Sequence, residues 1–214
     1  MNHCKNLLKL RRTFVARLER LERKLLASVT LAPQDRDPVI SYVAIESLNA
    51  WSQFAKALYL SCVINAKTEA RVAIAVVPAG LSMNDALGIA ITKYKKHATP
   101  NGLGEWARRD EPPWHDPNIL LGVCQQVDCS VYAQMQAAFS LGQRVFLDLP
   151  VFRNFFAHRN RLSSRAAQNL GPNYLLPSSL RPSEMLAKSK PASSVSVLEE
   201  WIAELKITAE FLCQ

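Results

Sequence analysis

Four polar side chains follow one another at spacings of four, three and four residues: Asn154, His158, Arg161 and Arg165. A helix turns about 100° per residue, so these spacings place side chains on one side of it. Imidazole changes its charge near neutral pH, and guanidinium presents a planar fork that suits phosphate. An imidazole in line with amide and guanidinium groups indicates acid–base chemistry on an anion.

The helix that must position these groups is predicted to begin at Asp148. An Asp can cap the first free N–H groups of a helix, and Pro150 is tolerated in the first turn. Gly171 is the first strong helix breaker that follows, so we expect the helix to run to about Leu170. An apolar strip suited to packing lies beside the polar line, and it contains Val151, Phe155, Leu162 and Ala166.

The segment Arg153-Asn154-Phe155-Phe156-Ala157-His158 resembles the signature of the HEPN ribonucleases. That signature is an Arg followed by a polar residue, a short spacer and a His, on a late helix of an α-helical domain. Residues 50–61 are similar to the second helix of many members. The spacing alone also fits Arg109-Asp110 followed by His115, but Pro112 and Pro113 exclude a helix there.

The resemblance implies an all-α, up-and-down helical bundle that forms a homodimer through the motif helix, with a site composed from both chains. It implies a metal-independent endoribonuclease without a cofactor, acting as a bacterial toxin or antiviral-defence effector. Its partners would be RNA, a second copy, and an antitoxin or regulatory protein. Some members carry a Tyr soon after the His that a partner enzyme modifies. Here Arg159 and Asn160 follow, which disfavours that type of control.

RNA is cut without a metal when its own 2′-hydroxyl attacks the adjacent phosphate and leaves a 2′,3′-cyclic phosphate. We expect His158 to act as general base or acid, Arg153 to clamp the phosphate and Asn154 to orient the His or the substrate. The predicted helix start would add a positive dipole end near Arg153 and Asn154. The candidate contacts to the RNA backbone are Arg159, Arg161 and Arg165. For Arg161 and Arg165, a solvated or acid-paired helix face is an equal alternative.

Arg153 and His158 are five residues apart, which is about 140° around a helix. One helix therefore does not direct both side chains at one atom. A two-fold pairing of two motif helices, with Phe155 or Phe156 in the seam, would let residues of both chains face a shared groove. The rival hypothesis is a non-catalytic helical RNA-binding or protein-interaction module, in which His158 is a hydrogen-bonded residue at the edge of the core.

Composition favours one helical domain, residues 1–214, that binds polyanions. The chain has 214 residues, seven Gly, a net charge of +8 and a pI near 9.4. This length can bury a proper core, and the charge indicates anionic partners. Residues 1–29 contain eight Lys and Arg and two Glu, and residues 151–190 contain seven Lys and Arg and one Glu. Two basic blocks thus flank a nearly neutral middle.

Apolar periodicity and capping residues divide the chain into helices. The predicted helices cover residues 6–28, 37–66, 82–97, 117–127, 130–141, 148–170 and 196–214. Residues 71–77 fit either a strand or a helical continuation, residues 98–116 a loop, and residues 171–195 a basic insert rich in Pro and Ser. Glu46 and Lys56 are the polar groups on the second helix that could reach a cleft.

The sequence predicts a reduced cytoplasmic protein that does not bind membranes. Its five cysteines are odd in number and scattered, and none forms a CxxC pair. Cys124, Cys129 and His115 fit no standard zinc spacing, so we expect no metal site. The N-terminus lacks the apolar run of a signal peptide, and no segment approaches the ~20 apolar residues that a membrane span needs.

Overall fold

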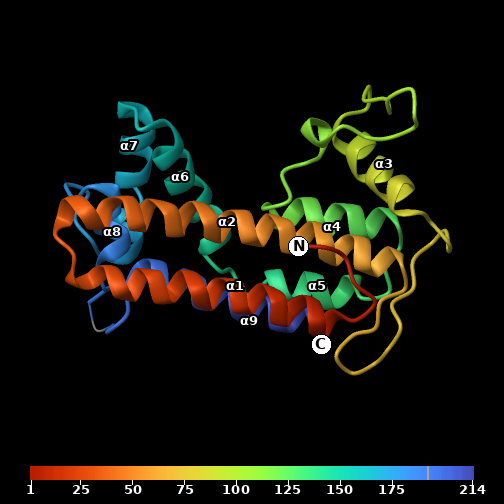
Figure 1. The fold of residues 1–214 in the computed structure, drawn as a ribbon, viewed down its shortest axis with the longest axis horizontal. Helices are drawn as coiled ribbons and strands as arrows, with labels where there is room; N and C mark the ends of the chain where they lie inside the picture. Colours follow the sequence, from red (N-terminus) through yellow and green to blue (C-terminus); the bar gives the residue numbers. More distant parts are fainter. Residues whose placement is uncertain (192) are drawn as a thin grey trace. The chain divides into compact units, whose positions relative to one another are not determined.

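The computed structural model describes residues 1–191 and 193–214, and this part of the chain is helical and contains no β-strand (Figure 1). The α-helices are α1 (Leu7–Ala27), α2 (Pro33–Val63), α3 (Met83–Tyr94), α4 (Pro117–Gln126), α5 (Tyr132–Phe139), α6 (Val145–His158), α7 (Arg161–Gln168), α8 (Pro182–Ala187) and α9 (Val197–Cys213). Short 3-10 helices cover Ser28–Thr30, Arg108–Asp110 and Gly171–Tyr174. The predicted all-α class is confirmed.

The chain forms two compact units, and α1, α2 and α9 each contribute a segment to both. The first unit comprises Met1–Phe14, Trp51–Leu141 and Thr208–Gln214. The second comprises Val15–Ala50 and Gly142–Ile207. All the site residues predicted from the sequence therefore belong to the second unit.

The predicted apolar faces of the long helices are buried. On α1 they are Leu7, Leu10, Phe14, Leu18, Leu21 and Leu25, and on α2 they are Ile40, Ala44, Leu48, Trp51, Ala55, Leu58 and Cys62. In the first unit, Phe14 stacks on Phe54 at 4.6 Å between ring centroids, and Trp51 lies 5.4 Å from Phe54. Helical spacing of apolar residues thus identifies the core correctly.

The core of the second unit is built around Trp201 of α9, which is 0% exposed. Phe152 of α6 meets its ring edge-on at 5.4 Å, and Tyr174 does so at 5.7 Å. Aromatic pairs favour such edge-on geometry. In this unit α6 also packs against α7, and α7 against α8 (Figure 1). These contacts hold the helix that carries the Arg-Asn-x-x-x-His motif.

Several predicted helix starts are confirmed, but the starts predicted for the second helix and for the motif helix are wrong. Ser82 and Asp85 form a reciprocal capping box at α3, and Asp116 caps α4 ahead of Pro117. The second helix, however, begins at Pro33 and not at the predicted residue 37, so Asp37 lies inside α2. Pro33 itself supplies the fixed φ that suits a first helical turn.

Two segments differ from simple loops or strands. Residues 71–77 are neither helix nor strand, although Ala73 forms an isolated antiparallel bridge with Lys67. The predicted insert 171–195 contains a 3-10 helix and α8, and it buries Tyr174, Met185 and Leu186. These three residues therefore belong to the core of the second unit, which is not expected from the Pro-rich composition of the segment.

Candidate functional site

The motif helix ends at His158, and the prediction of one helix to Leu170 is wrong. Arg159 adopts the left-handed conformation, with φ 44° and ψ 38°. Asn160 then caps α7, because its side-chain oxygen accepts a hydrogen bond of 2.9 Å from the N–H of Ser163. Asn competes well for cap positions and poorly for helix interiors. Asn154 and His158 consequently stay on α6, whereas Arg161 and Arg165 belong to α7.

The start of the motif helix also differs from the prediction. α6 begins at Val145, so Asp148 does not cap it; the Asp148 side chain is instead buried, at 2% exposed. Its carboxylate accepts hydrogen bonds from Arg144 at 2.9 and 3.2 Å and from the Tyr174 hydroxyl at 2.6 Å. The indole N–H of Trp201 donates to the same hydroxyl at 3.1 Å. Burial and the neighbouring carboxylate raise the pKa of Tyr174, so this network holds a neutral phenol.

This start changes the electrostatics expected at the motif. The positive dipole end of α6 lies at Val145, two turns before Arg153, and does not support it as predicted. His158 is the last residue of α6, so its imidazole lies at the C-terminal end of this 14-residue helix, away from the start that was expected to support the motif.

The three predicted catalytic side chains are exposed. Arg153, Asn154 and His158 lie on the solvent side of α6, and within residues 1–191 and 193–214 none of them makes a side-chain hydrogen bond or ion pair. Phe156 packs inward and Phe155 is half-buried, as expected for packing residues. The polar groups of the motif are therefore available to a ligand.

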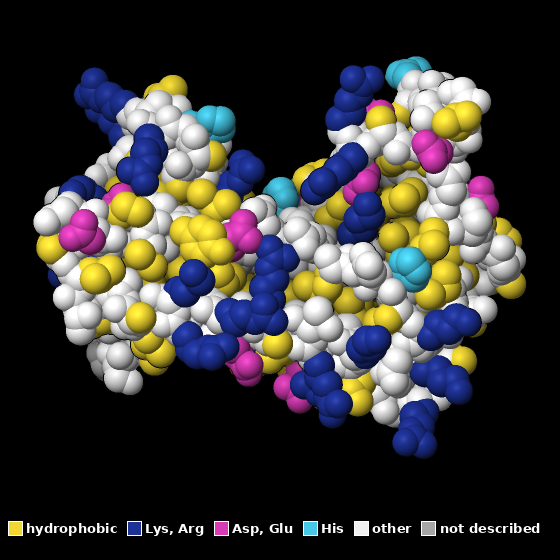
Figure 2. Space-filling model, in the orientation of Figure 1, with side chains coloured by type: hydrophobic (Ala, Val, Ile, Leu, Met, Phe, Trp, Pro, Cys, Tyr) yellow, Lys and Arg dark blue, Asp and Glu magenta, His cyan; other side chains and the backbone are white. Residues whose placement is uncertain are grey.

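The predicted RNA-binding arginines have different surroundings. Arg159 donates to the Asp37 carboxylate at 3.2 Å and to the Ser41 hydroxyl at 3.1 Å, which ties the helix break to α2. Arg161 and Arg165 are exposed on α7, and no acidic partner is found for them among the described residues. Figure 2 shows Lys and Arg side chains over α6 and α7. Arg161 and Arg165 thus remain open to a phosphate backbone.

The left-handed residue at the helix break can be tested by exchanging its side chain. We expect the free energy of unfolding of Arg159→Val to be about 1 kcal/mol lower than that of Arg159→Gly. A Cβ in this conformation costs about 1–2 kcal/mol, and the greater freedom of unfolded glycine offsets part of that. Both variants lose the ion pair with Asp37, so urea unfolding isolates the backbone effect. Equal free energies of unfolding for the two variants would contradict a left-handed conformation at residue 159.

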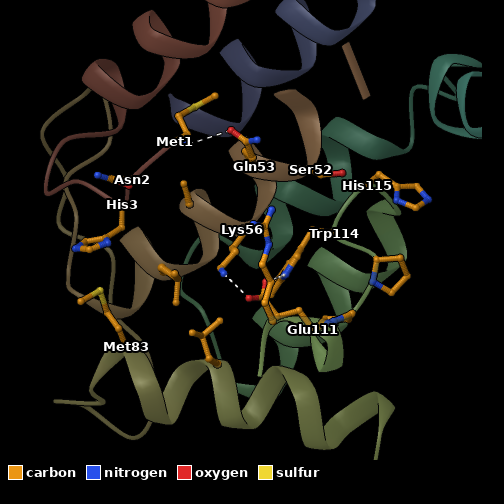
Figure 3. Close-up of a pocket in the computed structure, with 16 residues that line it drawn as sticks. Met1, Asn2, His3, Ser52, Gln53, Lys56, Met83, Glu111, Trp114 and His115 are labelled. Atoms are coloured by element: carbon orange, nitrogen blue, oxygen red, sulfur yellow. Dashed lines mark hydrogen bonds and ion pairs between the residues drawn. The ribbon is translucent and has the colours of Figure 1, made fainter. Parts of the chain in front are cut away.

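The sequence does not predict the hollow of ≈750 Å³ in the first unit, although Lys56, one of its lining residues, is among the groups expected to reach a cleft. Glu111 holds one wall of it, since its carboxylate accepts from Lys56 at 2.7 Å and from the Trp114 indole at 3.0 Å (Figure 3). His115 lies at the edge and points away from this pair (Figure 3). The other predicted cleft residue, Glu46, pairs with Arg17 in the second unit at 2.7 Å. Lys56 and Glu111 in this hollow are paired with each other, whereas Arg153 and His158 of the motif form no ion pair with a described residue.

Comparison of the chain with models of protein families, with curated proteins and with solved structures finds no match. In the described residues, no helix has the length and apolarity needed to cross a membrane. Over the same residues, no three His, Cys, Asp or Glu side chains converge as metal ligands do. The functional proposal therefore rests on the side chains of the motif and their surroundings.

Proposed function

We propose that the protein is a metal-independent, HEPN-type endoribonuclease. The observation that carries the proposal is the exposure of His158, without a side-chain partner in the described chain, at the end of α6 and one turn after Asn154. A histidine kept merely to stabilise the core would be buried and hydrogen-bonded. The resemblance extends the proposal to a toxin or antiviral effector restrained by an antitoxin or regulatory protein.

The cleavage step needs one proton removed and one delivered. A base takes the proton of the 2′-hydroxyl, and the 2′-oxygen bonds to phosphorus. The bond from phosphorus to the 5′-oxygen breaks, and that oxygen receives a proton, which leaves a 2′,3′-cyclic phosphate and a 5′-hydroxyl. His158 moves one of these protons, Arg153 stabilises the charge on the pentacoordinate phosphate, and Asn154 orients the imidazole or the substrate.

The proposal includes a homodimer with a composite site. The 140° between Arg153 and His158 on one helix keeps them from reaching one phosphate together. Leu147, 69% exposed on α6, and Leu162, 79% exposed on α7, offer apolar surface beside the motif. In a two-fold dimer, Arg153 of one copy and His158 of the other copy can act on the same phosphate.

Cleavage and the chemistry of its products test the proposal. Purified protein is incubated with single-stranded RNA in excess EDTA, and the product ends are identified by mass spectrometry. We expect cleavage with 2′,3′-cyclic phosphate and 5′-hydroxyl ends. Products with 5′-phosphate ends, or RNA that stays intact while the protein binds it in a salt-sensitive way, would leave the non-catalytic RNA-binding module as the better account.

Replacing the phosphate clamp has a defined expected cost. We expect Arg153→Gln to lower the cleavage rate about 10²–10³-fold, as the loss of a donor to a developing oxyanion does in other enzymes. Arg12→Gln, an exposed arginine of α1, is the matched control and should retain the wild-type rate. Mixing inactive Arg153→Gln with inactive His158→Ala should restore activity through heterodimers, and a mixture without activity would contradict the composite site.

A further inference from the structure

A smaller hollow, of ≈210 Å³, lies in the second unit and is lined by charged side chains. Its lining includes Arg36 and Asp37 of α2, Arg181 and Glu184 beside and within α8, and Lys188 just after α8. Water occupies about 30 Å³ per molecule, so this space holds roughly seven waters or one phosphate group with part of its hydration.

Two of the three cations in the hollow form no ion pair with a residue that the structure describes. Arg181 is occupied, because its guanidinium pairs with Glu184 at 2.9 Å. Asp37 is likewise taken by Arg159. Arg36 makes no ion pair in the part of the chain that the structure describes, and its Nε is buried without a hydrogen-bond partner. Lys188 is exposed and has no salt bridge to a described residue.

This charge distribution favours an anion. Arg36 and Lys188 line the hollow and form no ion pair with a described residue, so their charges are not neutralised by contact with a neighbouring carboxylate. Phosphate matches the guanidinium fork, and an ammonium group can add a second contact. The hollow thus offers two cationic side chains to one anion.

The hollow is connected to the catalytic motif through one ion pair. Arg36 adjoins Asp37, and Asp37 pairs with Arg159, the residue that follows His158. We propose that Arg36 and Lys188 bind a backbone phosphate of the RNA strand next to the phosphate that is cleaved. This inference rests on the proposed ribonuclease function, and it gives the site a second contact point along a single strand.

Binding can be measured separately from cleavage by working in the His158→Ala background. Arg36→Gln and Lys188→Gln are added to it, and fluorescence anisotropy follows a short labelled single-stranded RNA over a series of salt concentrations. We expect each added change to weaken binding about tenfold and to reduce the salt dependence by about 0.7 in log–log slope, the value for one phosphate contact on a single strand. Arg20→Gln, an exposed arginine of α1, removes the same charge and should change neither quantity comparably.

The outcomes separate this inference from the proposed function. If Arg36→Gln and Lys188→Gln behave like Arg20→Gln, the phosphate site is overturned, whether or not the wild-type protein cuts RNA. If they weaken binding while the wild-type protein cuts no RNA, the phosphate site stands and the ribonuclease proposal fails. Because Lys188 is exposed, its variant reports on binding even if Arg36→Gln disturbs folding.

Discussion

Changing His158 to Ala is expected to lower the rate of RNA cleavage about 10²–10⁴-fold. The imidazole is the group near the motif that can move a proton at neutral pH, and its exposure at the end of α6 leaves it accessible to substrate. The rate is measured with a labelled single-stranded RNA in EDTA at fixed pH and salt. RNA binding should change far less than the rate, because the backbone contacts of the neighbouring arginines remain.

The matched control for this change is His115→Ala. His115 belongs to the second segment that fits the family spacing, but it lies in a loop of the first unit, after Pro112 and Pro113. We expect its variant to cleave at the wild-type rate. Equal losses in both variants would indicate a general effect on folding. Unchanged cleavage in His158→Ala would remove the imidazole from the mechanism.

The second large effect concerns the support of the motif helix. Trp201→Ala is expected to lower the free energy of unfolding by about 3–5 kcal/mol, the usual cost of deleting a buried aromatic ring. The ring is fully buried, contacts Phe152 of α6 and Tyr174 edge-on, and donates its indole N–H to the Tyr174 hydroxyl. Urea unfolding followed by circular dichroism measures the change.

A conservative variant separates the two contributions of this tryptophan. Trp201→Phe keeps an aromatic ring against Phe152 and loses the indole N–H, so we expect a smaller cost than that of Trp201→Ala. Tyr174→Phe, which removes the hydroxyl that links Trp201 to Asp148, should cost about 1–3 kcal/mol because the buried indole N–H of Trp201 loses its acceptor and Asp148 keeps only its bonds from Arg144. A stability of Trp201→Ala equal to that of the wild type would mean that α6 is held by other contacts.

The helices and core positions could be predicted from local sequence, because both follow from periodicity. The buried faces of α1 and α2 repeat at spacings of three and four, and the capping boxes at Ser82 and Ser196 use residues three apart. Such signals need no knowledge of the tertiary fold. The prediction of the all-α class depends on them and is confirmed.

The surroundings of the motif could not be predicted in the same way. Arg159 takes a conformation that few residues with a Cβ adopt, and its side chain pairs with Asp37, which is 122 positions away. The sequence predicts Asp148 as a helix cap, because the partners that bury it, Arg144 and Tyr174, are identified only once the chain is folded. Local rules miss interactions of this kind, since tertiary contacts override local preference.

Attack by the 2′-hydroxyl can be tested by removing this proposed nucleophile from the substrate. An RNA is prepared with a single 2′-deoxynucleotide on the 5′ side of a linkage that the protein cuts, and it is incubated with the wild-type protein in EDTA. If the 2′-hydroxyl attacks its own phosphate under the control of His158, that linkage stays intact while other linkages are cut. Cleavage of the 2′-deoxy linkage at the rate of the unmodified one would contradict the account.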